Sequence, residues 1–305
     1  MSSNTRREFL AASALGLSLG RLRALPLSKI KLGVTTDEID DDVLTAVKFL
    51  KEYNLHWAEV RNIWGKYNTA QPVEKVKEAN GIFDSNGIKV SIEGTPFFKV
   101  PLPAEGPEGQ KKLDQQWAVL EAAVERAKLF GTDKMRVFGF TYGHEEKPAK
   151  TAYGRIYELI AEAGRRAKAH GLRLALENVN NSYIWTGEQA GEMLKHVKAD
   201  NVGMTWDPNN AAEGGERPFP DGYRKLDPAR IFHVHVRDFR HNAEGKVEWA
   251  PVGGGEFDNV SHIRAMLKDG YKGTFTLETH WKGPGGKAAS SATSLKGLLK
   301  VIEQV

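Results

Sequence analysis

Beyond residue 29, short apolar runs alternate with longer segments in which apolar residues recur every three to four positions. The short runs are rich in Val, Leu, Phe and Thr and are bounded by Gly, Asn, Asp or Pro, which is typical of strands. The longer segments have the period of amphipathic helices. Eight strands are therefore predicted, at 31–36, 56–61, 87–94, 133–140, 172–178, 201–207, 231–238 and 273–278.

Helices are predicted after most of these strands. Glycines at 131 and 171 end two of the helices, and Thr186 is an expected N-cap of a third. Three long polar segments without a helical pattern also follow strands, at 95–109, 211–230 and 240–256. The predicted helices cover 40–53, 72–86, 111–130, 149–170, 187–199 and 259–269, with a last helix at the C-terminus.

This regular alternation of strands and helices indicates a parallel sheet. Eight units over about 275 residues fit a single-domain α/β fold, the (β/α)8 or TIM barrel, with long strand-to-helix loops. A doubly wound open sheet is the alternative, but it would require a Gly-rich turn after the first strand, and VTTDEID has none. In a barrel the loops that follow strands share one face, so the three long polar segments are expected around the catalytic mouth.

Four consecutive strands in the second half of the chain end on potential metal ligands. The first, second and fourth end at Glu177, Asp207 and Glu278, and the third carries His233 and His235. Alone, each would be interpreted as a helix cap, a solvated charge or a core histidine, but a parallel barrel directs its strand ends toward one mouth. Three carboxylates and an imidazole suit a divalent cation, Mn²⁺ or Mg²⁺ first, with Zn²⁺ or Co²⁺ as alternatives.

The first 28 residues have a different pattern. A charged start with Arg6 and Arg7 is followed by the apolar run LAASALGLSLG and by RLRALPLS, which is typical of a secretory signal. The paired arginines favour the twin-arginine type, and we expect export to the periplasm, with a signal at 1–28 and the barrel at 29–305. A disordered basic tail is the alternative. The apolar run is too short for a stable membrane span.

Composition narrows the possible chemistry. The chain has no cysteine, which excludes disulfides, thiolate nucleophiles and Cys-ligated zinc. Its formal net charge is +4, and the first 28 residues carry four arginines against one glutamate. The remaining chain is therefore close to neutral at about +1, without the basic excess of a nucleic-acid-binding protein, so no nucleic-acid partner is expected.

Five motifs give the chain a resemblance to a known superfamily. They are LEN at 176–178, WDPNN at 206–210, HVRD at 235–238, PVGGGEFD at 251–258 and LETHW at 277–281. With these motifs, residues 30–300 resemble the xylose isomerase-like barrels, which include sugar isomerases and epimerases and, more distantly, apurinic-site endonucleases. In the ketose 3-epimerase branch, Glu, Asp, His and Glu on successive strands hold the metal.

The resemblance implies specific roles for these residues. The metal ligands would be Glu177, Asp207, His235 and Glu278, with Mn²⁺ as the first expectation for the cofactor. His233 would lie one layer deeper, as a buried hydrogen-bonded residue. Sugar epimerases of this type have a histidine three residues after the metal aspartate, whereas this chain has Asn210, which cannot carry a proton.

The implied activity is that of a metal-dependent sugar isomerase or epimerase. Glu177 and Glu278 would be the catalytic pair that moves the proton α to a carbonyl through a metal-stabilised enediolate. The same chemistry on a 3-keto-glycoside would make the protein an exported lyase. A non-enzymatic periplasmic carbohydrate-binding barrel is the third hypothesis. The expected partner is a sugar or glycoside, and because relatives often form dimers or tetramers, a homo-oligomer is a further hypothesis.

Substrate contacts are predicted at the mouth. Tryptophans could stack on sugar faces, with packing in the core or at the rim as the alternative, also for Trp206. For Arg237 the alternative is an ion pair with a nearby carboxylate. Glu93, Arg61 and Arg136 also stand at strand ends, but each alone is interpreted as structural. The predicted substrate-binding residues are Asn210, Arg237, His280, Trp185, Trp281 and His144.

Overall fold

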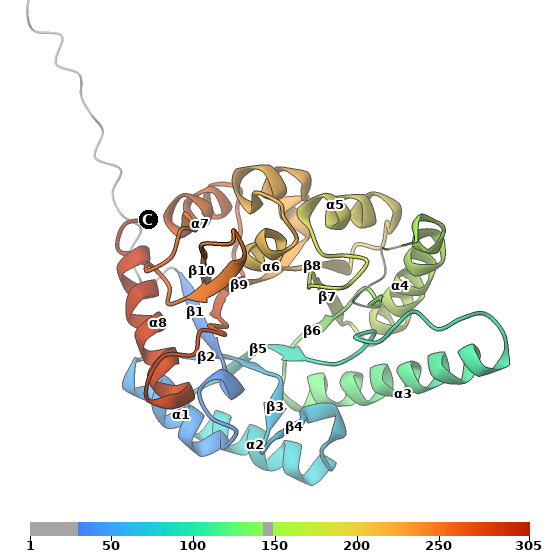
Figure 1. Ribbon diagram of the computed structural model, residues 1–305. Coiled ribbons are helices and arrows are strands. Elements are labelled where there is room, and N and C mark those ends of the chain that lie inside the picture. The colour runs from blue at the N-terminus through green and yellow to red at the C-terminus, as the bar shows by residue number, and fades with distance from the viewer. Residues whose placement is uncertain (1–29, 143–148) are drawn as a thin grey trace, which may run out of the picture.

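Eight parallel strands close into a barrel in the computed structural model, which describes residues 30–142 and 149–305 (Figure 1). The strands follow one another around the ring in chain order, and the last pairs with the first, with Phe275 opposite Leu32. The predicted fold is confirmed. The strands are β1 Lys31–Thr35, β2 Trp57–Val60, β5 Lys89–Gly94, β6 Lys134–Val137, β7 Arg173–Glu177, β8 Val202–Trp206, β9 Ile231–Val236 and β12 Thr274–Leu277.

Helices surround the barrel on its outer side (Figure 1). Asp42 caps one by accepting a hydrogen bond from the Thr45 amide at 2.8 Å. Thr186 caps another in a capping box with Gln189, as predicted. The long helices are α1 Val43–Glu52, α2 Val73–Ser85, α3 Pro107–Leu129, α4 Tyr153–Lys168, α5 Gly187–His196, α7 Asn259–Lys268 and α8 Gly286–Ile302.

Two of the predicted loops contain helical structure. Helix α3 begins at Pro107 rather than at 111, because Gly106 turns the chain with a φ of 101° and a proline is favourable at a first helical position. The prediction of a plain loop over 211–230 is also wrong. A short helix, α6 Pro208–Glu213, and several single turns between 218 and 230 fill this connection.

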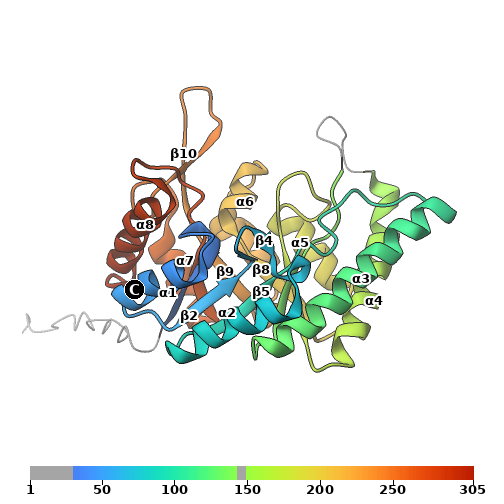
Figure 2. The same ribbon diagram turned by 90° about the horizontal axis from the view of Figure 1, so that it is seen from below.

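Two small antiparallel hairpins extend the strand-to-helix loops. The first pairs β3 (Asn62–Ile63) with β4 (Lys66–Tyr67). The second pairs β10 (Asp238–His241) with β11 (Val247–Ala250), where a loop was predicted, and it projects from the barrel (Figure 2). Its turn is made by Gly245, which adopts a φ of 75°.

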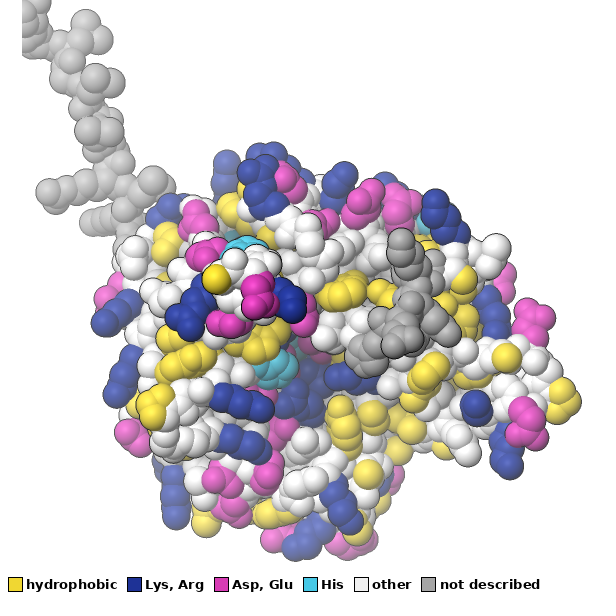
Figure 3. All heavy atoms as spheres, viewed as in Figure 1, with side chains coloured by type: hydrophobic (Ala, Val, Ile, Leu, Met, Phe, Trp, Pro, Cys, Tyr) yellow, Lys and Arg dark blue, Asp and Glu magenta, His cyan; other side chains and the backbone are white. Residues whose placement is uncertain are grey.

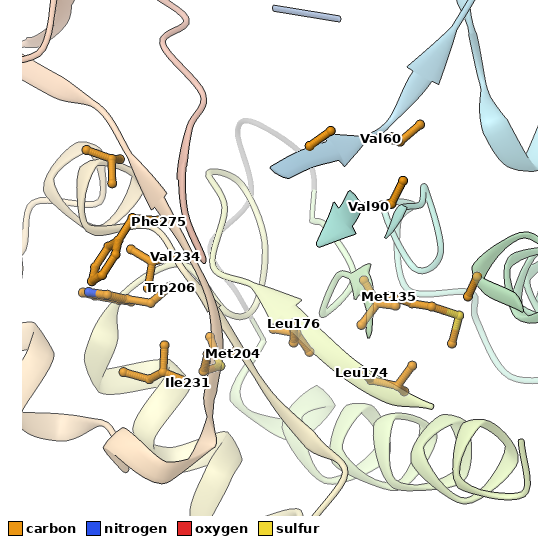
Figure 4. Packing of buried hydrophobic residues seen from close by; sticks show 14 of the residues in the cluster. Val60, Val90, Met135, Leu174, Leu176, Met204, Trp206, Ile231, Val234 and Phe275 are labelled. Carbon is orange, nitrogen blue, oxygen red and sulfur yellow. The ribbon is translucent and has the colours of Figure 1, made fainter. Parts of the chain in front are cut away.

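The core lies between the strands and the helices. Leu174 and Leu176 of β7, and Met204 and Trp206 of β8, are buried in one large apolar cluster (Figure 4). Because side chains alternate along a strand, the residues between these positions face the barrel interior, as does the residue that follows Trp206. The ends of β7 and β8 therefore present the polar side chains of Glu177 and Asp207 to the mouth, while the preceding apolar residue anchors each strand in the core.

A helix that spans a membrane must be both long and apolar. Within residues 30–142 and 149–305, no helix combines the length and apolar character needed to cross a bilayer. Two predicted features, the signal at 1–28 and the contact residue His144, lie outside the described residues.

Candidate metal centre

The four predicted ligands come together at the mouth of the barrel. Glu177 ends β7, Asp207 follows β8, His235 lies in β9 and Glu278 follows β12. One nitrogen or carboxylate oxygen from each residue lies within 4.8 Å of the others, and all four side chains are buried. We call these four residues the quartet. Side chains separated by up to about a hundred positions thus share one small volume.

Two atoms of the quartet lack a hydrogen-bond partner. His235 Nδ1 and Glu278 Oε2 are buried and form no hydrogen bond, and they lie 3.1 Å apart, where they form an ion pair only if His235 is protonated. Leaving a buried polar atom unpaired costs about 1–3 kcal/mol, so such atoms indicate a missing partner. Three carboxylates and one imidazole are a donor set that divalent cations accept. The residues therefore fit a divalent metal ion.

The backbone fixes the orientation of Asp207. Its Oδ1 accepts hydrogen bonds from the amides of Asn209 at 2.9 Å and Asn210 at 3.0 Å, and so caps α6. The Asn178 side chain bridges to the main chain of Asp207 from the neighbouring strand end. With Oδ1 occupied, Oδ2 is the oxygen that faces the quartet, at 3.5 Å from His235 Nδ1.

Glu59 of β2 orients both histidines of β9. Its Oε2 lies 2.8 Å from His235 Nε2 and 3.1 Å from His233 Nε2, and all three side chains are completely buried. His233 thus lies deeper in the barrel than His235. The contact with Glu59 leaves His235 Nδ1 facing the quartet, an arrangement that is common for metal-binding histidines. Sequence reasoning missed Glu59, although it faces inward two residues before Arg61.

Two arginines from the other side of the barrel reach the quartet carboxylates. Arg136 Nη1 lies 3.2 Å from Glu177 and Glu59 and 3.5 Å from Glu278. Arg61 donates to Glu278 at 2.6 Å. The interpretation of Arg61 and Arg136 as merely structural is too narrow, because each contacts a predicted catalytic glutamate.

A glycine makes room for these two arginines. A Cβ atom on Gly94, the last residue of β5, would lie 2.9 Å from Arg61 Cβ and 3.3 Å from Arg136 Nη2. Both distances are shorter than an ordinary carbon contact. A side chain at position 94 would therefore displace one or both guanidinium groups from the carboxylates.

A third arginine, Arg237, follows β9. It forms an ion pair with Asp207, and it also contacts Asn210 Oδ1 at 2.6 Å and His280 Nδ1 at 2.7 Å. The ion pair that was the alternative interpretation of Arg237 is therefore present, and its predicted substrate contact stays a prediction. Asn210 is buried and its amide nitrogen lies 3.3 Å from Glu177 Oε1, which places both predicted contact residues beside the quartet.

The ion-paired groups around the quartet carry an excess of negative charge. Six carboxylates meet three arginines, so the formal charge is −3 when the histidines are neutral. A divalent cation would offset most of this charge. The carboxylates belong to Asp37, Glu38, Glu59, Glu177, Asp207 and Glu278, and the arginines are Arg61, Arg136 and Arg237.

The pKa values reflect the same imbalance. Burial would lower the pKa of His235, but Glu278, Glu59 and Glu177 outweigh it and raise that pKa well above its ordinary value. Burial would raise the pKa of Glu278, yet the charges of His235 and His280 hold it well below the usual range. A protonated His235 therefore offsets part of the negative charge of the surrounding carboxylates. Metal binding would release this proton.

Two neighbouring cavities lie at the mouth, where the surface is hollowed (Figure 3), and they share Arg61, Trp249 and His280 in their linings. The smaller one, of about 180 Å³, is lined by Glu177, Glu278, Asn210, Arg237 and Lys99, among others, and we call it the quartet pocket. The larger one, of about 950 Å³, lies beside it and is called the cleft below. Lys99 was not predicted, and burial lowers the pKa of its ammonium group.

Only some of the aromatic residues predicted to contact the substrate line one of the two cavities. His280 lines both cavities and Trp281 lines the cleft. Trp206 is completely buried in the core and cannot stack on a ligand. Trp185 lines neither cavity, because its indole nitrogen is tied to the Asn210 carbonyl at 2.7 Å, so its predicted substrate contact is not supported.

Trp249 and Glu93 differ in their relation to the two cavities. Trp249, on the β10–β11 hairpin that was predicted as a loop, lines both cavities. Glu93 was interpreted as structural, and it lines neither cavity. Desolvation raises the pKa of its buried carboxyl group well above the usual value, against the opposing charge of Arg126 on α3.

Comparison with known proteins places this geometry in context. A model of the xylose isomerase-like TIM barrel family matches residues 47–300. No curated protein matches the chain. Many solved structures are similar to this chain.

A crystal structure of IolI protein with a bound zinc atom has a TM-score of 0.73 and 19% identity, covering 90% of this chain and 99% of that one. A probable 3-DHS dehydratase from Bacillus anthracis has a TM-score of 0.69 and 19% identity, covering 88% and 99%. A D-tagatose 3-epimerase-like protein has a TM-score of 0.66 and 18% identity, covering 90% and 99%. At these identities, the likeness establishes a shared fold.

Proposed function

Since the chain belongs to the xylose isomerase-like TIM barrel family, we propose that it is a metal-dependent sugar isomerase or epimerase. The reaction would begin with removal of a proton from the carbon next to a carbonyl group. The observation that carries this proposal is the convergence of Glu177, Asp207, His235 and Glu278 in one buried cluster at the mouth. The fold shared with an epimerase-like protein and a zinc-containing protein supports it.

The quartet would hold one divalent cation, with Mn²⁺ as the first expectation and Mg²⁺, Co²⁺ or Zn²⁺ as alternatives. When bound, the ion supplies Lewis-acid stabilisation of the negative charge that develops on the carbonyl oxygen. Glu59 keeps His235 in the orientation that presents Nδ1 to the quartet.

Glu177 and Glu278 would move the proton. Both line the quartet pocket, and the Arg136 guanidinium lies between them, at 3.2 Å from one and 3.5 Å from the other. Burial would raise the pKa of Glu177, but Arg136 and His235 outweigh burial and lower it, so the group is ionised and can act as a base. A proton returned to the neighbouring carbon gives an isomer. A proton delivered to the opposite face of the same carbon gives an epimer.

Other residues of the quartet pocket would position the sugar. Asn210, Arg237 and Lys99 offer hydrogen-bond donors along its wall. Since Arg237 is already bound to Asp207 and Asn210, its guanidinium is fixed before a sugar arrives. Such preorganised donors lose little entropy when they bind hydroxyl groups.

The test is exchange of the α-hydrogen. Protein loaded with Mn²⁺ is incubated with free ketoses in deuterated water, and deuterium on the carbon next to the carbonyl is measured by NMR. We expect exchange in the wild type and its loss in Glu278→Gln. The exposed hairpin residue supplies the matched control Glu248→Gln, which should retain exchange. Undiminished exchange in Glu278→Gln would overturn the two-glutamate mechanism.

A lyase acting on 3-keto-glycosides is the second candidate, because the cleft leaves room for a group attached to the sugar. The base would take the proton next to the ketone, the electron pair would form a carbon–carbon double bond, and the glycosidic oxygen would leave. Lys99 lines the quartet pocket and could give that oxygen a proton. Product analysis separates the candidates, because the lyase yields two fragments from one glycoside.

Export to the periplasm through the signal at 1–28 is also proposed, on the pattern of paired arginines before an apolar run. Replacing Arg6 and Arg7 together by lysine should retain the protein in the cytoplasm, as measured by fractionation. Equal periplasmic amounts of the variant and the wild type would rule out the twin-arginine route.

A further inference from the structure

The cleft adjoins the quartet pocket. Its walls come from the loops after β1, β2 and β12 and from the β10–β11 hairpin, and Arg61, Trp249 and His280 line both cavities. The cleft has a volume of about 950 Å³, whereas the quartet pocket has about 180 Å³. Ligand pockets usually measure about 300–1,000 Å³, so the quartet pocket alone is small and the two together suit a larger molecule.

Two tryptophans line the cleft as half-buried flat surfaces. Trp249 lies under the Arg237 guanidinium, which is 4.5 Å from the ring centroid, and beside the ring of His280. Trp281 packs against Gly283, where a Cβ atom would overlap the indole ring. Both rings are therefore held in place by contacts that a ligand does not have to provide. Flat aromatic surfaces of this kind bury the apolar face of a sugar ring.

Two polar atoms in the cleft wall lack partners. Asp37 is only 5% exposed, and its Oδ1 has no hydrogen bond, although its Oδ2 accepts from Arg61 and Asn62, both at 2.9 Å. The side-chain oxygen of Asn62 is likewise buried and unpaired. Both residues line the cleft, and these two oxygens lie buried beneath its surface.

The charges of the cleft are largely paired with one another. Arg61 bridges Asp37 and Glu38 at 2.9 and 3.0 Å, and Lys287 binds Asp41 at 3.0 Å. Among the described lysines and arginines that line the cleft, Lys282 alone has no ion pair. Anionic ligands such as phosphates usually require several free cationic side chains or an amide cradle. Charges that are mostly paired, together with two indoles, instead suit a neutral molecule with many hydroxyl groups.

From these observations we propose that the cleft binds a second sugar ring, joined by a glycosidic bond to the ring over the quartet. The inference rests on the proposed function for the position of the first ring. It makes a saccharide of at least two rings the preferred substrate, with free ketoses as weaker ones. The second ring would stack on Trp249 or Trp281.

His280 marks the junction between the two subsites. It adopts a φ of 48°, in the left-handed region that non-glycine residues rarely occupy. Its ring contacts Arg237 at 2.7 Å, and its amide donates to Glu38 at 3.2 Å. Strained residues persist where surrounding contacts hold them, and they concentrate at ligand sites. The position between the subsites suits a contact with the glycosidic linkage.

Binding of disaccharides tests the proposal without requiring turnover. The full chain, both loaded with Mn²⁺ and metal-free, is titrated with cellobiose, maltose, gentiobiose and sucrose and with their monosaccharides, by calorimetry and by tryptophan fluorescence. We expect at least one disaccharide to bind about tenfold more tightly than its monosaccharides, as one good stacking contact would give.

Three variants locate the effect. Trp281→Ala should reduce the disaccharide advantage to less than about twofold, and Trp249→Ala provides a second, independent variant on the projecting hairpin. Trp57→Ala is the matched control, since this tryptophan starts β2 and contacts Lys31 and Lys89, away from the cleft. The control should retain the advantage. Thermal unfolding identifies any variant that fails to fold.

The outcomes separate this inference from the proposed function. If no disaccharide binds more tightly than its monosaccharides, or if both cleft variants retain the advantage, the second-ring subsite is wrong. Exchange of deuterium into free ketoses in that case would leave the proposed function intact. Conversely, a disaccharide advantage that disappears in the cleft variants, without exchange in any sugar, would support the subsite and overturn the proposed chemistry.

Discussion

The barrel mouth has two halves whose strand ends carry side chains of mostly opposite charge. Strands β7, β8, β9 and β12, the ligand half, supply the quartet. Strands β1, β2, β5 and β6, the arginine half, supply Arg61, Arg136 and, in the loop after β5, Lys99. Each half also contains exceptions. Glu59 of the arginine half holds His235, Asp37 and Glu38 after β1 pair with Arg61, and Arg237 of the ligand half holds Asp207.

This difference indicates how a concentration of buried carboxylates is tolerated. Burying an unpaired charge is costly, and the cost falls when an opposite charge is held close by. Arg136 touches Glu59, Glu177 and Glu278 at once. The arginine half therefore stabilises the same carboxylates that a divalent ion would bind. The arginines and a divalent ion would act on the same carboxylate oxygens. Substitutions of the arginines or of the quartet residues can therefore separate the two contributions to stability.

The largest effect is expected from Arg136→Met, which removes the central cation of the arginine half. The three carboxylates it contacts would remain buried with less compensation, so the metal-free protein should lose about 3–5 kcal/mol of unfolding free energy. Mn²⁺ should recover much of this loss. Urea unfolding with and without Mn²⁺ measures both quantities, and an equal loss in both conditions would contradict the shared role of arginine and metal.

Asp207→Asn tests the ligand half directly. The amide oxygen can still cap α6, so the fold should persist, while one negative ligand is removed. We expect Mn²⁺ to bind more than about 100-fold more weakly, since even residues that only orient a ligand cost 10–100-fold. Calorimetry measures the affinity. The control is Asp258→Asn, which keeps a cap acceptor on α7, away from the mouth, and should bind Mn²⁺ as the wild type does.

Glu59→Gln removes the residue that crosses from the arginine half to the ligand half. Glutamine can still accept one imidazole hydrogen bond but no longer carries the charge that orients and polarises His235. The expected loss of Mn²⁺ affinity is about 10- to 100-fold, smaller than that of Asp207→Asn. If the affinity stays within a factor of about two of the wild type, Glu59 does not position the ligand histidine.

The smallest effect concerns a histidine behind the ligand half. His262 accepts a hydrogen bond from Trp206 Nε1 at 3.2 Å, and complete burial lowers its pKa to about 3. The unfolded state, with an ordinary pKa near 6.5, binds more protons below that value, so stability is retained above it and lost as the pH falls. Between pH 7.5 and 5.5 this should cost about 1.4 kcal/mol.

His262→Gln keeps an acceptor for Trp206 and removes the titration. The fall in unfolding free energy between pH 7.5 and 5.5 should therefore be about 1.4 kcal/mol smaller in the variant. Metal-free protein is used for both the wild type and the variant, so that protonation of the quartet contributes equally to their pH dependence. Equal pH dependence in the variant and the wild type would show that His262 is not the titrating group.

The sequence was sufficient for the barrel because each strand alternates strongly. Leu174 and Leu176 on one side of β7, with Glu177 at the end, carry both the strand prediction and the site prediction. The same reasoning brought the quartet together, because strand ends in a closed parallel barrel must meet. Whether the quartet holds a metal ion remains a prediction.

The arginine half was harder to predict for a physical reason. Glu59, Arg61 and Arg136 are single polar residues, and the sequence does not show which oxygen a long guanidinium side chain reaches. Trp249 escaped prediction because its hairpin has the pattern of a polar loop, and the hydrogen bond from Trp185 to the Asn210 carbonyl was not foreseen because it depends on the path of α6. Side-chain reach and loop path are set by tertiary contacts that local periodicity does not encode.

Gly94 carries a consequence for recognising related chains. The proximity of Arg61 and Arg136 depends on one absent carbon atom in β5. A search that compares only metal-binding positions would group together chains that share the quartet but differ at this small residue. A glycine at the end of the third barrel strand, together with arginine at the ends of the second and fourth, is therefore a sequence signature that would sort such chains by how they neutralise their acids.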